Sequence, residues 1–183
     1  QSGGEGASEG AQGISHALMA ERYALPGELI VGTDSHTPHS GALGCVAFGV
    51  GTTDMANALG TGAVRLTVPQ SLRVVLSGCI PPGVTAKDIV LHLLADPFIR
   101  AGGGVGKVFE FTGDAITQLA TDERATLTNM TAELGGFTGI VAPDGSGEVG
   151  GFNATGEGRV GGSPLVLLYS DDLDATVEAV RAA

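Results

Sequence analysis

The stretch ELIVGTDSHTPHSG (residues 28–41) joins a short apolar run to a polar loop that ends at a glycine. Its first five residues predict a buried β-strand, because they are mostly aliphatic and are bounded by turn-forming residues. The loop behind them gathers an aspartate, two histidines and hydroxyl side chains in a chain otherwise rich in small apolar residues. Because loops that follow strands are held by a rigid sheet yet open to solvent, the stretch predicts a functional loop on a layered scaffold.

The composition around this loop is that of one globular domain without a nucleic-acid partner. The chain has 183 residues, of which 43% are hydrophobic but only 4% aromatic, and 31 are glycine. Such a core must be aliphatic and closely packed. The formal net charge is −11, from 20 acidic and 9 basic side chains without a basic cluster. That balance excludes a phosphate-backbone footprint, whereas a small carboxylate can still be bound by a few polar groups.

The cysteines and the apolar runs indicate in which cellular compartment the protein is expected. The two cysteines, Cys45 and Cys79, form no CxxC motif, which predicts a reducing, cytoplasmic setting, and we expect both to be buried in the core. The longest apolar runs fall far short of the roughly 20 residues that a membrane helix needs. No basic and apolar leader precedes the first predicted helix, so neither a membrane nor a secretion signal is predicted.

Predicted helices and strands alternate outward from the loop. Upstream, a helix is predicted for residues 14–25, ISHALMAERYAL. Downstream, one or two closely packed helices are predicted for residues 42–62, ALGCVAFGVGTTDMANALGTG. Two strands joined by a turn are predicted for residues 64–80, VRLTVPQSLRVVLSGCI. In the next helix, residues 85–96, Thr85 is the expected N-cap, with Asp88 three residues later. A strand, a helical region with a break and a further strand follow up to residue 144.

These elements predict the fold class and the domain boundaries. Alternating segments favour an α/β layered domain with a mixed sheet over residues 14–144. Residues 1–13 are Gly, Ser and Glu-rich and are interpreted as a flexible linker. Residues 145–183 form a Gly-rich segment followed by a strand-helix tail, whose abrupt end is typical of a truncated chain.

The chemistry of the loop permits three interpretations. Asp34 and His36 are two residues apart, so in an extended segment both side chains project to one side, where the carboxylate fixes the imidazole tautomer and makes it a proton donor near neutral pH. Ser35 can then bind an anionic oxygen. Alternatively the loop is a turn in which Asp and Ser bond backbone donors. A metal site formed by His36 and His39 is the third interpretation.

A family resemblance covers residues 12–144. PGELIVGTDSHTPHSGALGCVAFGVGTTDMANAL resembles the signature segment of the aconitase family, which includes aconitase, homoaconitase and the large subunit of isopropylmalate isomerase. GISH, PPGVTAKDIVLHLL, FEFTG and TLTNMTAELGGFTGIVAPD are also similar to family segments, in the family's order. TLTNM and VAPD lean toward the isopropylmalate and homoaconitate branch. The tail faintly resembles half of a vicinal-oxygen-chelate (glyoxalase-like) module; alternatively, it is a strand and helix that complete the sheet.

The resemblance implies roles for particular residues. In the family, the histidine of the Asp-Ser-His motif, here His36 with Asp34, helps protonate the departing hydroxyl, and the serine contacts substrate. The histidine of GISH is implied to pair with the glutamate of TNMTAE, here His16 with Glu133. The resemblance therefore implies Asp34, His36, His16 and Glu133 as catalytic residues and Ser35 and Asn129 as substrate-binding residues, with no metal ligand in this chain.

The implied reaction is the dehydration and rehydration of a small hydroxy di- or tricarboxylic acid. In the complete family enzyme a [4Fe–4S] cluster acts as Lewis acid on the leaving hydroxyl. The cluster cysteines, the catalytic serine and the substrate-binding arginines of the family have no match in this sequence. The resemblance thus implies one part of a hydro-lyase, inactive alone, holding no cluster itself and needing companion domains or chains that carry the cysteines. The alternative is a non-catalytic binding or scaffold module, or a recombination of unrelated fragments, so whether this chain is an enzyme is left open.

Overall fold

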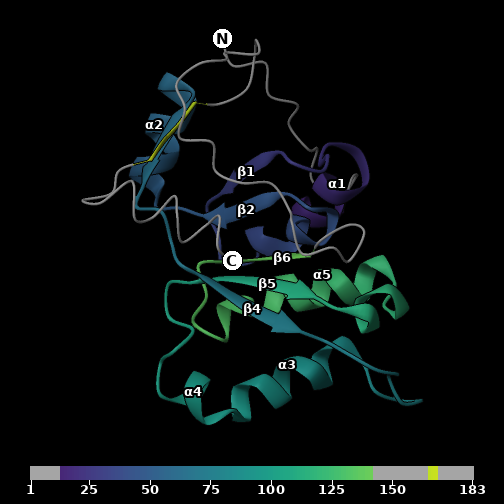
Figure 1. Cartoon of the computed structure of the whole chain (residues 1–183). Helices are drawn as coiled ribbons and strands as arrows, with labels where there is room; N and C mark the ends of the chain where they lie inside the picture. The colour runs from purple at the N-terminus through teal and green to yellow at the C-terminus, as the bar shows by residue number, and fades with distance from the viewer. Residues whose placement is uncertain (1–12, 142–164, 169–183) are drawn as a thin grey trace.

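The computed structural model describes residues 13–141 and 165–168, which form two parts joined side by side (Figure 1). The first, here called the N-terminal part, contains α1 (Ser15–Arg22), β1 (Leu29–Gly32), the 3-10 helix η1 (Thr37–Leu43), β2 (Val46–Gly49), α2 (Thr52–Thr61) and β3 (Ala63–Leu66). The second, the three-stranded part, contains β4 (Ser71–Val75), α3 (Ala86–Ala95), α4 (Pro97–Arg100), β5 (Val108–Thr112), η2 (Asp114–Gln118), α5 (Thr121–Asn129), η3 (Met130–Ala132) and β6 (Thr138–Val141). A last strand, β7 (Leu165–Leu168), pairs with β3.

The α/β class expected from the sequence is confirmed, but the sheets are not mixed. Among the described strands every pair is parallel: β1 with β2, β3 with β7, and β4-β5-β6 in that order. The two strands predicted around Pro69 exist as β3 and β4, yet they belong to different sheets. The turn expected between them is therefore a connection from one part to the other.

Residues 45–49 depart from the sequence prediction. The run ALGCVAFGV predicts a helix because nearly every position is small or apolar, whereas the structure forms β2, paired in register with β1. Gly44, in the left-handed conformation at φ 78°, ends η1 and turns the chain into this strand. A short apolar run fits a buried strand and a buried helix equally well, so tertiary pairing with β1 decided its conformation.

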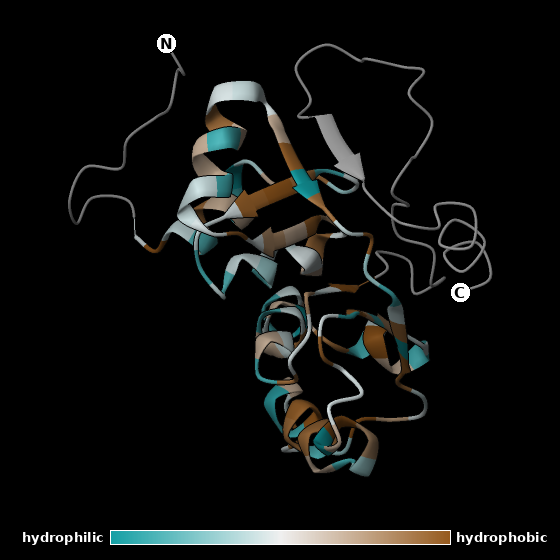
Figure 2. Cartoon of the chain, turned by 90° about the vertical axis from the view of Figure 1, so that its left-hand side faces the viewer, coloured by the Kyte–Doolittle hydropathy of each residue, from teal (hydrophilic) through white to brown (hydrophobic). Residues whose placement is uncertain are grey.

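The core of the three-stranded part lies between its sheet and α3 and α5. β5 is the central strand and is buried on both faces, as a parallel strand covered from two sides requires. The buried cluster consists of Ala86, Val90, Phe109, Phe111, Ile116, Leu119, Leu127, Leu134 and Val141. Figure 2 shows hydrophobic segments in the strands of this part and alternating hydrophobic and hydrophilic segments along its helices.

The helix predicted after Thr85 is present as α3. The Asp88 carboxylate accepts hydrogen bonds from the Thr85 backbone N–H at 2.8 Å and from the Thr85 hydroxyl at 2.7 Å. This closes the first turn and satisfies donors that the helix itself leaves unpaired. The capped start fixes α3 against the core through Ala86 and Val90, both fully buried.

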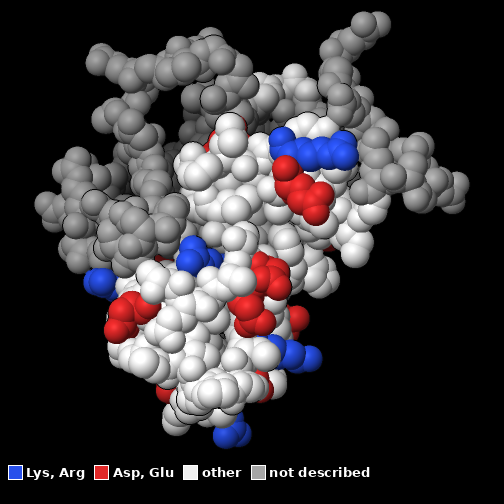
Figure 3. All heavy atoms as spheres, turned by 90° about the vertical axis from the view of Figure 1, so that its right-hand side faces the viewer, with Lys and Arg blue, Asp and Glu red and all other residues white. Residues whose placement is uncertain are grey.

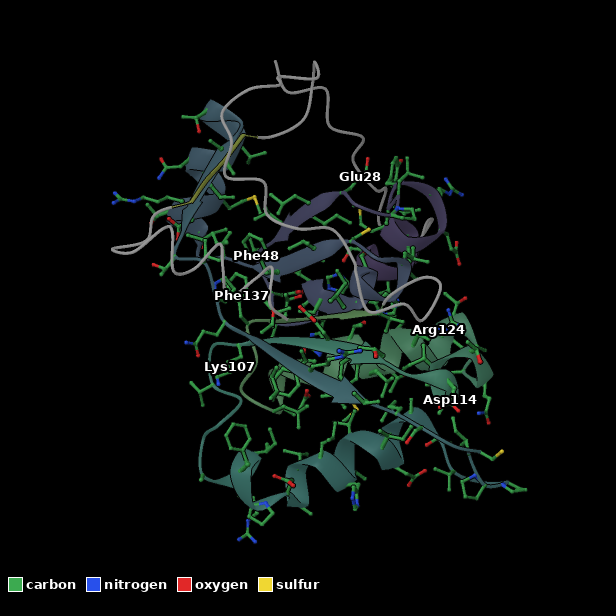
Figure 4. The ribbon with its side chains drawn as sticks, viewed as in Figure 1. Glu28, Phe48, Lys107, Asp114, Arg124 and Phe137 are labelled. Atoms are coloured by element: carbon green, nitrogen blue, oxygen red, sulfur yellow. The ribbon has the colours of Figure 1, made fainter. Side chains whose placement is uncertain are left out.

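The two parts meet where β2 and η1 lie against β6 and α5. The rings of Phe48 and Phe137 lie 4.7 Å apart between centroids, on opposite sides of this junction (Figure 4), and the Thr138 hydroxyl donates to the Ala47 carbonyl. Gly41 lies so close to Gly139 that a Cβ on Gly41 would come within 1.9 Å of the Gly139 carbonyl oxygen. η1, which follows the loop after β1, is thereby held against β6 and α5.

Some sequence expectations fall outside the described residues. The predicted linker lies there except for Gly13, as do the Gly-rich segment and the helix of the tail. The strand predicted in the tail is described as β7. Within the described residues no helix combines the length and apolar character required to span a bilayer.

Candidate functional site

The loop between β1 and η1 is held between two helices that are distant in sequence. α1 packs on η1 from one side, and α5 and β6 pack on it from the other. His16 lies on α1, Asp34 and His36 lie in the loop, and Asn129 ends α5. Folding therefore brings to one place the side chains that the sequence places in three segments.

Asp34 is anchored through one carboxylate oxygen. Oδ1 accepts the backbone N–H of His36 at 3.0 Å and lies 3.2 Å from the Thr37 hydroxyl, which also donates to the Asp34 carbonyl at 3.0 Å. This is a turn in which the aspartate bonds the backbone two residues on. The turn interpretation of the loop is thus met at Asp34. The segment is not extended as expected, yet the side chains of Asp34 and His36 both lie near His16.

The second oxygen of Asp34 pairs with His16. His16 Nε2 lies 2.9 Å from Asp34 Oδ2, with the His16 side chain 20% exposed and that of Asp34 52% exposed. Burial alone would raise the pKa of Asp34, but the hydrogen bond and charge of His16, with the bonds from His36 and Thr37, hold that pKa below its ordinary value. Asp34 is therefore a carboxylate at neutral pH, and its oxygen fixes the His16 tautomer with the proton on Nε2.

Two further imidazoles, those of His36 and His39, lie near this pair. The ring centroid of His16 lies 6.3 Å from that of His36 and 6.4 Å from that of His39. His36 is exposed, whereas His39 is half-buried. Burial lowers the pKa of His39, and the charge of His16 lowers it further, which favours a neutral imidazole there.

Asn129 and His39 link the loop to α5. The Asn129 amide nitrogen lies 3.5 Å from His39 Nδ1, and the buried Thr128 hydroxyl donates to the His39 carbonyl at 3.2 Å. Sequence reasoning weighed His39 only as a metal ligand and did not place it beside Asn129. Its spacing from His36, one turn of a short helix, was the signal that could have grouped the two histidines.

The pairing of His16 with Glu133 implied by the resemblance is not what the structure forms. Within the described residues Glu133 makes neither a hydrogen bond nor an ion pair with His16; its exposed side chain follows η3, which packs on α3, α5 and β6. α1, which carries His16, packs instead on η1, so Asp34 is the carboxylate within reach. Ser35 is exposed next to Asp34, on the solvent side of the loop.

The cysteines of this chain do not fit an iron–sulfur cluster, which thiolates bind. The buried Cys45 donates its thiol to the Leu25 carbonyl at 3.1 Å, and burial raises its pKa to about 11, so it stays protonated. Cys79 is exposed, against the expectation of burial, because it lies in the loop after β4 rather than in the sheet. Across the described residues no three His, Cys, Asp or Glu side chains are arranged to bind a metal ion.

The arrangement can bind and protonate an anion. A fixed imidazole–carboxylate pair donates or accepts a proton without reorganisation, and two further imidazoles beside it offer N–H donors to a carboxylate or hydroxyl. Figure 3 shows one face of the molecule, where charged side chains form small separate groups on a mostly uncharged surface. At the site itself, the imidazoles of His16, His36 and His39 are the groups that can meet an anion.

Comparisons with known proteins identify the family of the chain. The aconitase family model (aconitate hydratase) matches residues 4–147. The chain is 47% identical over 136 residues to a 3-isopropylmalate dehydratase large subunit of Syntrophus aciditrophicus and 46% identical over 133 residues to one of Pyrococcus furiosus. These matches cover 74% and 72% of this chain and 32% and 31% of those proteins.

A chloroplastic relative, the 3-isopropylmalate dehydratase large subunit of Arabidopsis thaliana, is 42% identical over 134 residues, which cover 73% of this chain and 26% of that protein. The chain thus spans about a third or less of the length of these relatives. The family match extends over the whole described site, from α1 to β6. The chain belongs to the aconitase family.

Proposed function

We propose that this chain supplies part of the substrate-binding and proton-transfer site of a hydro-lyase that dehydrates and rehydrates a hydroxy dicarboxylic acid of the isopropylmalate type. The observation that carries the proposal is the His16–Asp34 pair at 2.9 Å, with His36 and His39 grouped around it. The names of the relatives support the choice of substrate class.

The geometry of the site and the match to the family motifs support the proposed roles. Asp34 stays ionised and orients His16, whose imidazole relays a proton, while the exposed His36 protonates the departing hydroxyl. Ser35 and Asn129 bind substrate oxygens. Glu133, exposed at the end of η3, is proposed as a further acid–base group, following its match to the family motif.

The proposed reaction needs groups from outside this chain. Enzymes of the aconitase family carry a [4Fe–4S] cluster, which supplies Lewis acidity to the hydroxyl that leaves. Because neither cysteine here fits cluster ligation, we assign the cluster to companion domains or chains, among them a small subunit. We also propose the cytoplasm as the compartment, since a reducing setting suits free thiols.

A second candidate function rests on the same cysteine observation. If no companion brings a cluster, the chain is a carboxylate-binding or scaffold module without turnover. Anaerobic incubation with iron and sulfide separates the two. We expect cluster absorbance only when the chain is mixed with the remaining part of the Syntrophus aciditrophicus large subunit and its small subunit, together with dehydration of 3-isopropylmalate. A mixture that acquires no cluster, or that acquires the cluster and shows no dehydration, would support the module.

Substrate binding is tested on the chain itself by following its imidazoles with NMR. The four histidines divide into three at the site and His92 on α3, which serves as an internal control. We expect 3-isopropylmalate to shift the ring signals of His16, His36 and His39 and to leave His92 unchanged. Equal shifts of all four rings, or none, would contradict the proposal.

The matched variant is His36→Ala. Because His36 is exposed, its loss should change the free energy of unfolding by no more than about 0.5 kcal/mol, the usual range for surface substitutions. Binding of 3-isopropylmalate should fall at least tenfold. Glu21→Ala, an exposed change on α1, should leave both quantities unaltered.

A further inference from the structure

Thr37 lies directly behind the carboxylate that pairs with His16. It opens η1, and its side chain is buried, with 3% of the residue exposed, although the loop around it is open to solvent. A buried hydroxyl must find hydrogen-bond partners inside the protein. The single hydroxyl proton is shared between two acceptors of Asp34: the backbone carbonyl at 3.0 Å and Oδ1 at 3.2 Å.

These contacts make the two oxygens of Asp34 unequal. Oδ1 is bound by the His36 backbone N–H and by the Thr37 hydroxyl, and Oδ2 is left to His16. A carboxylate bound at Oδ1 alone by one backbone N–H could still rotate about its Cβ–Cγ bond, since that torsion is broad. A second contact on the same oxygen restricts the rotation and keeps Oδ2 aimed at α1.

The position of the Thr37 hydroxyl is restricted by its close contact with the end of β1. A Cβ added to Gly32 would lie 2.1 Å from Thr37 Oγ1, so the last residue of β1 leaves room only for a hydrogen atom. A Cβ on Gly49, the residue paired with Gly32 in β2, would lie 2.3 Å from the Asp34 carbonyl oxygen. The ends of two paired strands thus hold Thr37 and the Asp34 backbone in place.

We propose that Thr37 is a positioning residue, whose hydroxyl locks the Asp34 carboxylate so that Oδ2 holds the His16 imidazole in a single tautomer. It touches neither substrate nor any reacting atom in this role and acts through Asp34. The importance of Thr37 for the reaction rests on the proposed function. The restriction of the Asp34 carboxylate by the Thr37 hydroxyl, in contrast, is a property of the folded chain. The test therefore needs no turnover, and its failure is distinguishable from failure of the proposed function.

The test is the tautomer of His16, read from its ring ¹⁵N shifts at about pH 8, above the ordinary titration range of imidazole. In the natural chain we expect the proton on Nε2. In Thr37→Val, which has nearly the same shape without the hydroxyl, we expect a mixture of tautomers. Thr37→Ser, which keeps the hydroxyl, should restore the Nε2–H form.

Further readouts separate positioning from a purely structural role. In Thr37→Val the pKa of Asp34 should rise toward its ordinary value, whereas that of Asp88, lowered by Thr85 on a distant helix, should not move. If Thr37→Val does not fold, Thr37→Ala takes its place with the same expectation. An unchanged His16 tautomer in a folded variant lacking the hydroxyl, or a mixture in Thr37→Ser, would overturn the proposal.

Discussion

The three histidines of the site have the same side chain but different surroundings, which give them different chemical properties. His16 is held by a carboxylate, His36 is open to solvent, and His39 is half-buried against Asn129. The sequence located the loop and its Asp-Ser-His motif, because glycines and a preceding strand isolate them. The resemblance implied Glu133 as the partner of His16, whereas the structure pairs His16 with Asp34. The choice depends on how α1 packs on η1, a contact that no local pattern encodes.

His39 should make the folded chain sensitive to mild acid. Its pKa is lowered on folding by burial and then by the charge of His16, so below about pH 6.5 the unfolded chain binds the proton more readily. Stability should therefore be fully present above that pH and decline as the pH falls from there toward the lowered pKa of the folded state. Urea unfolding at a series of pH values measures the decline, and His39→Gln should reduce it. A variant with the same pH dependence as the natural chain would contradict this assignment.

The helix α3 could be predicted from its own residues, whereas the strand β2 could not. α3 was predicted with its cap because Thr85 and Asp88 stand three residues apart at its start. β2 was missed because Ala, Cys, Val and Phe in a short run lack a distinguishing period, and only pairing with β1 makes them a strand. Local capping chemistry is therefore a firmer guide here than apolar content.

The cap of α3 can be tested by Thr85→Ala. Removing the hydroxyl that donates to Asp88 should lower the free energy of unfolding by about 1 kcal/mol, the usual contribution of a capping side chain. Chemical denaturation measures the difference. Thr121→Ala is the matched control, an exposed threonine in the first turn of α5, where no side-chain cap is formed, and it should cost much less. Equal losses in the two variants would show that the hydroxyl of Thr85 does not cap the helix.

The molecule as a whole depends on close backbone contact between its two parts. Gly41 of η1 and Gly139 of β6 touch without side chains between them, and the rings of Phe48 and Phe137 close the same junction. The abundance of glycine in the sequence predicted tight packing somewhere in the fold. It could not indicate which glycines face each other, because the two are brought together by tertiary folding alone.

Gly41→Ala tests this junction. The added Cβ would meet the Gly139 carbonyl, which is backbone and cannot turn aside, so we expect a loss of about 1–3 kcal/mol in unfolding free energy and displaced His39 and Asn129 signals. Gly60→Ala, in an exposed turn of α2 with nothing within 4 Å, is the control. It should stabilise the chain by up to about 1 kcal/mol, as alanine does in helices. If Gly41→Ala is as stable as the natural chain, the contact is looser than described.

The contacts at this junction form in a definite order while the polypeptide is being synthesised, because their two sides lie far apart in the sequence. The Thr128 hydroxyl that supports His39 comes 89 positions later in the chain, and the Thr138 hydroxyl that meets Ala47 comes 91 positions later. The Asp34 turn can close as soon as Thr37 leaves the ribosome, because its contacts span three residues. α5 and β6, which pack on η1 behind this turn, are synthesised later. A nascent chain halted before α5 should therefore form the turn but should lack the complete histidine cluster.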